Sequence, residues 1–176
     1  MVAPYLLIEP EHTWVAEADN RVVGYLTGSV GVLFGIQRAQ LALLAVDRLL
    51  WKHMLGKYKH HPRSQQFVRF VLTEALLQVP AHPSHAGHFH FNVAEGHRGQ
   101  GIGSHLIAEF ERVVMESGLR RYYAEVMCWG EKQEAYYTRL GYRIHGHPIS
   151  ATVFATEVPD LRIMCIVKDL ADSTVS

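Results

Sequence analysis

The sequence predicts a single α/β domain over residues 1–176, built around a β-sheet. Three observations indicate this class: an antiparallel hairpin over 13–30, a strand, loop, helix and strand over 87–127, and two later strands. The first observation predicts an antiparallel strand pair and the second a β-α-β unit. A chain of 176 residues can bury about 70% of its unfolded surface in one core.

Two strands joined by a tight turn open the predicted sheet. Thr13–Ala18 and Arg21–Val30 are the strands, and Asp19 and Asn20 between them tolerate positive φ, which is typical of a hairpin. The preceding Met1–Glu11 contains two prolines and is expected to form an edge strand or a partial helix.

A helical insert is predicted over residues 31–80. From Ile36 to Leu55 the apolar residues fall on one arc of a helical wheel, which indicates a packed amphipathic helix. After a basic loop, Ser64–Val79 is a second helix, bounded by a proline at each end. The arc of the first helix consists of Ala39, Ala42, Leu43, Val46, Leu49, Leu50 and Met54.

A strand, a glycine-rich loop, a helix and a second strand form the centre of the chain. Gly87–Ala94 alternates between apolar and polar residues, as a strand does. Helical spacing then runs from Ile102 to the stop at Ser117 and Gly118. Arg121–Met127 is rich in aromatic and β-branched residues, which favours a central strand.

The loop within His97–Leu106 has glycine at every second position, at Gly99, Gly101 and Gly103. Glycines let backbone N–H groups approach a ligand closely, and the following helix N-terminus adds positive dipole. The loop therefore predicts an anion cradle, most often for phosphate. The spacing G-x-G-x-G argues against a dinucleotide site, which needs G-x-G-x-x-G directly after its strand.

A short helix, Glu131–Leu140, and two strands, Tyr142–Gly146 and Leu161–Lys168, complete the predicted fold. A loop beginning at Pro148 separates these strands. Residues 171–176 are predicted to form a frayed tail.

The charge balance argues against a polyanionic partner. The chain has 17 Lys and Arg against 17 Asp and Glu, so no nucleic-acid partner is expected. The most apolar helix, Ile36–Leu55, contains charged residues and is too polar to span a membrane. Cys128 and Cys165 lack metal-type spacing, and the N-terminus has no leader pattern, so a cytoplasmic location is expected.

Four histidines crowd the segment before the glycine loop: His82, His85, His88 and His90. Their spacing mixes helical and strand-like intervals and no cysteine joins them, so no metal site is expected. Cys128 has no neighbouring base and is expected to be a buried thiol rather than a nucleophile.

Three motifs together resemble the GNAT superfamily of N-acyltransferases. Arg98–Gly103 resembles its acyl-CoA signature R/Q-x-x-G-x-G/A, His88–Val93 its preceding strand, and Tyr137–Tyr142 its motif Y-x-x-x-G-F/Y. The resemblance covers residues 13–170 without the insert. It implies the acyl-CoA N-acyltransferase fold, a splayed mixed sheet, and acetyl-CoA as the co-substrate.

The same resemblance implies how acetyl-CoA is held. Its pantetheine arm is expected along the strand that ends near Val93, where a backbone amide polarises the thioester carbonyl, and its pyrophosphate on the loop amides. The implied cofactor-binding residues are Phe91, Asn92, Val93, Arg98, Gly99, Gln100, Gly101, Ile102, Gly103 and Ser104.

The chain also departs from the family pattern. The strand and two helices that usually precede the hairpin are nearly absent, so we expect the insert to take over their role in acceptor binding. This arrangement is similar to bacterial members with such an insertion and to the acetyltransferase-like domain joined to some O-GlcNAc hydrolases. Ala94 stands where proline is common, and Gly130 where asparagine is common, which removes one side-chain contact.

N-acyl transfer needs a proton acceptor for the amine and a proton donor for the leaving thiolate. Tyr137 resembles the family's general acid, with a packing role as the alternative, while the adjacent Tyr136 points about 100° away on a helix. Glu125, a carboxylate in an apolar strand, is the candidate base, and an ion-paired strand residue is its alternative. His90, which shares a strand face with Asn92, is a further candidate, with a structural role as its alternative.

The sequence therefore predicts transfer of an acetyl group from acetyl-CoA to a primary amine of a small molecule or peptide. The amine attacks directly in a ternary complex. A non-catalytic domain of the same fold, binding acyl-CoA or a partner protein, is the alternative. The resemblance also allows a homodimer, and no motif identifies the acceptor.

Overall fold

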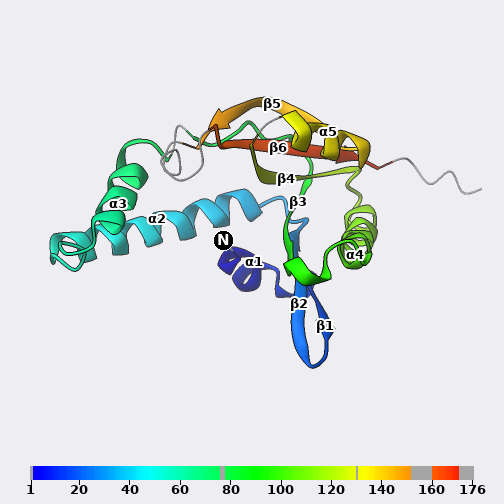
Figure 1. The fold of residues 1–176 in the computed structure, drawn as a ribbon, viewed down its shortest axis with the longest axis horizontal. Coiled ribbons are helices and arrows are strands. Elements are labelled where there is room, and N and C mark those ends of the chain that lie inside the picture. The colour runs from blue at the N-terminus through cyan, green and yellow to red at the C-terminus, as the bar shows by residue number, and fades with distance from the viewer. Residues whose placement is uncertain (1, 76–77, 130, 152–159, 171–176) are drawn as a thin grey trace, which may run out of the picture.

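The structure is a computed structural model that describes residues 2–75, 78–129, 131–151 and 160–170 (Figure 1). Its helices are α1 (Ala3–Ile8), α2 (Phe34–Met54), α3 (Pro62–Thr73), α4 (Ile102–Glu116) and α5 (Glu131–Arg139), with 3₁₀ turns η1 (Pro10–His12) and η2 (Glu95–His97). Its strands are β1 (Thr13–Ala18), β2 (Arg21–Ser29), β3 (Gly87–Val93), β4 (Arg121–Cys128), β5 (Arg143–Ser150) and β6 (Arg162–Asp169).

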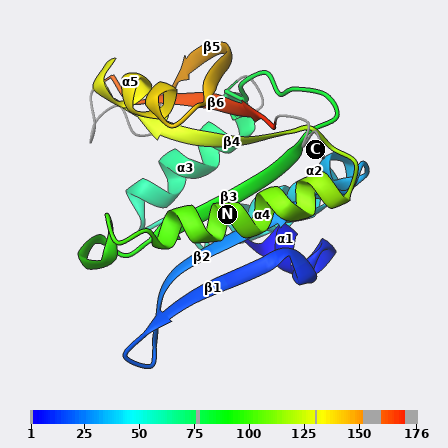
Figure 2. The same ribbon diagram turned by 90° about the vertical axis from the view of Figure 1, so that its right-hand side faces the viewer.

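The strands form one six-stranded mixed sheet in the order β1-β2-β3-β4-β6-β5. All neighbouring pairs are antiparallel except β3 and β4, which are parallel. These two strands pair only at Gly87 with Tyr122 and at His88 with Tyr123. Beyond that point they separate, as Figure 2 shows, so the predicted mixed, splayed sheet is confirmed.

The predicted hairpin is confirmed as β1 and β2. Asp19 and Asn20 have φ of 52° and 58°, the left-handed values that a two-residue hairpin turn requires. The opening segment forms a partial helix, α1, with a proline in its first turn, where the missing N–H costs nothing.

The main core lies between the sheet and α4. Phe110 and Val114 of α4 are fully buried against Leu26 and Phe89 of the neighbouring strands and the ring of Tyr122. Helices α1 and α2 lie on the opposite side of β2 and β3 from α4 (Figure 1). The two faces of the central strands therefore meet different helices.

The insert is helical, as predicted, but it does not form a packed amphipathic layer. Helix α2 extends away from the sheet toward α3 (Figure 1), and Leu43 and Met54 are 69% and 77% exposed. A helical wheel reports an apolar arc but not whether anything packs on it, so the prediction of packing was wrong for most of α2. No helix among the described residues is long and apolar enough to cross a membrane.

The second insert helix ends earlier than predicted. Helix α3 spans Pro62–Thr73, and Val68 is its buried residue. The strand predicted over Tyr142–Gly146 runs further, as β5, because an irregular register between His145 and Ile149 lets pairing with β6 resume.

Three other sequence features lie outside the described residues. They are Gly130, most of the loop beginning at Pro148, and the tail over 171–176.

Candidate active site

The glycine loop before α4 adopts the backbone conformation that its glycines allow. Gly99 and Gly101 have φ of 78° and 82°, a region that side chains disfavour. Gly101 is the N-cap of α4. No atom lies within 4 Å of the position that a Cβ on Gly99 would take, so the loop is open at this point.

The first turn of α4 presents free backbone donors. The N–H groups of Ile102, Gly103 and Ser104 have no acceptor within the helix. No side chain caps this helix, and its first turn contains no acidic residue. Unpaired N–H groups and the positive end of a helix dipole suit a phosphate group, as the sequence predicted.

Two polar side chains of the loop are bonded to nearby backbone. The Nε of Arg98 donates to the carbonyl of Val93 at 3.1 Å, and Nε2 of Gln100 donates to the carbonyl of Gly96 at 3.3 Å. Arg98 is exposed and tied across the end of β3 by this bond. Its charge therefore stands beside the cradle.

The free edge of β3 faces the opening between β3 and β4. The N–H of Ala94 donates to Val23 at 2.8 Å, and only every second residue of an antiparallel strand bonds its neighbour. The backbone N–H of Asn92 therefore also points toward β2, while the N–H groups of Phe91 and Val93 point toward the opening. These amides are available to a ligand lying along β3, whereas the Asn92 side chain is exposed.

Ala94 occupies its position without strain. Its φ is −55°, close to the value that proline would impose, so proline would fit the backbone at this position. Proline would remove the hydrogen bond from Ala94 to Val23.

Tyr137 lies on α5, on the α4 side of the sheet. Its half-buried ring meets that of Tyr142 edge-on at 6.3 Å, and Tyr142 is hydrogen-bonded through its hydroxyl to Tyr122. Burial raises the pKa of the Tyr137 phenol, which keeps it protonated. The adjacent Tyr136 is 51% exposed, as expected for its different helix face.

Cys128, at the end of β4, is fully buried. Burial raises the pKa of its thiol, so the thiolate that a nucleophile requires is disfavoured. The prediction of a buried thiol is confirmed.

Glu125 lies on the other face of β4, in the part that has separated from β3. Its Oε1 is 2.7 Å from Nε2 of His82, and its Oε2 is 3.3 Å from Nη2 of Arg38. Burial alone would raise the pKa of this carboxyl, but the His82 hydrogen bond and the Arg38 charge lower it to about 2. Glu125 is therefore an ionised, paired carboxylate with little affinity for a proton.

His88 belongs to the same cluster but is deeply buried. Its Nδ1 is 2.7 Å from the Tyr5 hydroxyl, and its ring stacks on Tyr123 at 4.5 Å. Burial and then the charge of Arg38 lower the pKa of His88 to about 3, so its imidazole stays neutral. It is a structural histidine that joins α1 to the sheet.

His90 faces the same side of β3 and is half-buried. Its ring stacks on Tyr25 at 5.8 Å, and its Nδ1 lies 3.2 Å from the Tyr25 hydroxyl. Burial lowers the pKa of His90. The structure brings His90 into the neighbourhood of Glu125 without a direct bond between them.

Arg38 and His82 are the site residues that sequence reasoning missed. Arg38 was only a polar interruption of a helix, and His82 only one member of a histidine run. Their contacts with Glu125 join positions 87 and 43 residues apart, which no local pattern records. In the described ranges, no group of three or more His, Cys, Asp or Glu side chains is arranged to hold a metal ion.

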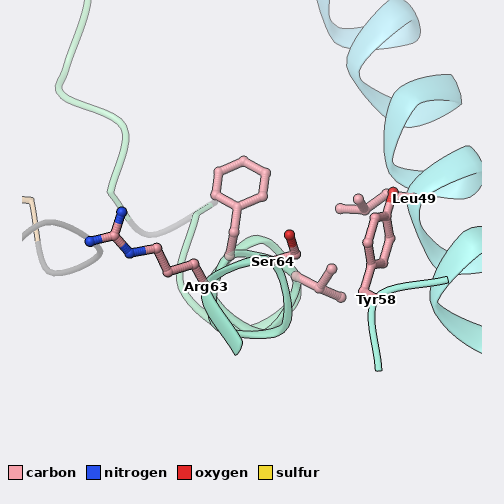
Figure 3. A pocket seen from close by; sticks show the side chains of 6 residues that line it. Leu49, Tyr58, Arg63 and Ser64 are labelled. Atoms are coloured by element: carbon pink, nitrogen blue, oxygen red, sulfur yellow. The ribbon is translucent and has the colours of Figure 1, made fainter. Parts of the chain in front are cut away.

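A separate hollow of about 390 Å³ lies in the insert rather than at this site. It is lined mainly by α2, α3 and the loop between them, with Leu49 and Tyr58 facing Ser64 across it (Figure 3). Its walls are largely apolar and include none of the predicted catalytic residues.

Comparisons with known proteins agree with this geometry. Residues 64–142 match the model of the acetyltransferase (GNAT) family. The crystal structure of SsHAT is similar, with 25% identity and a TM-score of 0.56, covering 98% of this chain and 79% of that one. Naa20 of Chaetomium thermophilum, solved with a bisubstrate analogue, shares the fold at 15% identity and a TM-score of 0.57, covering 96% and 70%. No curated protein sequence matches the chain.

Proposed function

We propose that this protein, whose residues 64–142 match the model of the acetyltransferase (GNAT) family, transfers an acetyl group from acetyl-CoA to a primary amine. The amine attacks the thioester directly in a ternary complex. The observation that carries the proposal is the separation of β3 from β4 beyond His88 and Tyr123. This separation opens the sheet. One face at the opening carries free backbone N–H donors and the Tyr137 phenol, and the other face carries charged side chains.

The residues on the α4 side fit acetyl-CoA. The amides of Gln100 to Ser104 are proposed to hold its pyrophosphate, because the helix start is uncapped and Gly99 leaves open space. The outward N–H groups of Phe91 and Val93 are proposed to hold the pantetheine arm and polarise the carbonyl. Acetyl-CoA supplies the activated acyl group.

Tyr137 is proposed to donate the proton that the leaving thiolate needs. Its raised pKa favours the protonated phenol, and its position on α5 puts it on the cofactor side. A protonated phenol within hydrogen-bond reach can serve as a general acid.

The acceptor is proposed to approach from the face that carries Glu125. The insert supplies Arg38 to this face, which supports the expectation that the insert contributes to acceptor binding. A small-molecule or peptide amine is the proposed class, and the equal charge totals favour no polyanionic acceptor.

The test is thiol release from acetyl-CoA across a panel of small amines, aminoglycosides, polyamines and lysine peptides, with acetyl-CoA binding followed by calorimetry. Turnover with at least one amine supports the proposal. Binding without release for every amine supports the alternative, an acyl-CoA-binding domain that does not catalyse transfer. The pairing of Glu125 with Arg38 favours that alternative, because it leaves the predicted base with little proton affinity. A cytoplasmic homodimer stays a prediction.

A further inference from the structure

We propose that His82 is the group that takes the proton from the acceptor amine, and that Glu125 and Arg38 position it. This inference rests on the proposed acetyltransferase function and deepens it. The observation behind it is the contact between His82 Nε2 and Glu125 Oε1 at 2.7 Å.

The contact decides which nitrogen of His82 carries the proton. An ionised carboxylate can only accept hydrogen bonds, so Nε2 must be the donor to Glu125. In a neutral imidazole the lone pair then lies on Nδ1. No hydrogen bond to Nδ1 of His82 is present in the described part of the chain, and the side chain is 27% exposed. A basic nitrogen is thus left accessible.

The imidazole of His82 is also held in a fixed plane. Its ring stacks on Tyr123 with centroids 4.9 Å apart and an angle of 29°. Tyr123 in turn stacks on the buried His88. Arg38 holds the second oxygen of Glu125, so the carboxylate cannot easily rotate away from His82.

The pair stands where the sheet opens. Tyr123 is the last residue of β4 that pairs with β3, and Glu125 follows it on the same face of the separated part. That face is the one proposed for the acceptor, opposite the α4 core. The imidazole therefore stands on the side of the sheet from which the amine is proposed to arrive, and Tyr137 stands on the other side.

The protons balance in the proposed step. As the amine nitrogen bonds to the acyl carbon and the carbon–sulfur bond breaks, His82 Nδ1 takes a proton from the amine. Tyr137 gives its phenolic proton to the leaving sulfur. The products are an amide and the CoA thiol, and proton exchange with water restores both side chains. The negative charge of Glu125 stabilises the imidazolium that forms.

Several charged or titratable groups face His82. Glu125 and Tyr123 come from β4, Arg38 from α2 and His88 from β3. Tyr123 and His88 stay neutral near pH 7, because burial raises the pKa of Tyr123 to about 12 and lowers that of His88 to about 3. Glu125 and Arg38 are then the charged groups that face the imidazole.

The test uses an acceptor found in the amine panel and the variants His82→Ala and His82→Gln. We expect kcat/KM to fall about 100-fold or more in both, with KM for acetyl-CoA unchanged. Added imidazole should restore part of the activity of His82→Ala. His85→Asn is the control, because His85 is an exposed histidine of the same loop whose φ of 51° asparagine tolerates.

Circular dichroism and acetyl-CoA binding check that the variants fold. A decrease of less than twofold in both His82 variants, or no rescue of His82→Ala by imidazole, would overturn the role of His82 while leaving the acetyltransferase function intact. Absence of turnover in the unaltered protein with every amine would refute both.

Discussion

Arg38 of α2 contacts Glu125 of β4 across 87 residues of sequence, with Nη2 3.3 Å from a carboxylate oxygen. This ion pair ties the helical insert to the separated part of the central strand. Since Glu125 also contacts His82, the loop that ends the insert is joined to the same point. The insert is therefore held to the candidate active site by these side-chain contacts as well as by its covalent connection to the sheet.

Replacing Arg38 should test whether the insert serves the acceptor. We expect Arg38→Met to reduce kcat/KM for the amine about tenfold or more, because Glu125 would lose the charge that orients it. Acetyl-CoA affinity should stay within twofold, since Arg38 lies on the other face from the glycine loop. Arg48→Met, on an exposed part of the same helix, is the matched control. Equal kinetics for the two variants would contradict a role for Arg38.

The acid stability of the protein should depend on Glu125. Its pKa is about 2 in the folded protein against an ordinary value of 4.5, so the folded state favours the ionised form. The stabilisation is present above the ordinary value and is lost as the pH falls toward the folded value. The free energy of unfolding in urea should therefore fall as the pH decreases from about 5 to about 2. Glu125→Gln should flatten this slope, whereas Glu109→Gln, at an exposed surface pair, should leave it unchanged.

Tyr137→Phe should separate cofactor binding from catalysis. Removing the hydroxyl takes away the proposed proton donor, so kcat should fall about 100-fold or more. Acetyl-CoA affinity should change little, because the ring packing on Tyr142 is retained. Tyr136→Phe, at the exposed neighbouring position, should keep full activity. Equal loss in both variants would refute the assignment to Tyr137.

Gly101→Ala should weaken both the fold and cofactor binding. Its φ of 82° is left-handed, and a Cβ there costs about 1–2 kcal/mol. Calorimetry should show weaker acetyl-CoA binding, because relief of the strain would move the amides at the start of α4. Gly96→Ala is the control, since its φ is not positive and a Cβ there meets no atom within 4 Å. Unchanged stability and affinity in Gly101→Ala would show that the loop tolerates another conformation.

Among the glycines of the sheet, Gly28 should tolerate a larger side chain least. A Cβ at this position would overlap the Phe110 ring, so Gly28→Ala forces the core to shift at a cost of about 1–3 kcal/mol. Gly35→Ala, within α2 where a Cβ meets nothing, should instead stabilise the protein by about 0.5–1 kcal/mol. Urea denaturation of the two variants measures whether the free energy of unfolding falls in Gly28→Ala and rises in Gly35→Ala. A neutral result for Gly28→Ala would mean that Phe110 has room to move.

Much of the fold could be predicted from local patterns. The turn at Asp19 and Asn20, the strand over Gly87–Val93 and the glycine cap of α4 all follow from preferences of residues close together in the chain. The shape of the glycine loop was predictable for the same reason, because it depends on the conformations that its own glycines allow. The exposure of α2 was not, since an apolar arc does not reveal whether another surface covers it.

The candidate acceptor side required the folded structure. Glu125 stood out in the sequence as a carboxylate in an apolar strand, but its partners Arg38 and His82 come from separate segments. The local conformation of the backbone depends mainly on neighbouring residues, so the strands, the turns and the glycine loop can be predicted directly. The meeting of distant charges depends on how the whole chain packs, and that packing makes Glu125 a paired carboxylate and leaves His82 with an accessible nitrogen.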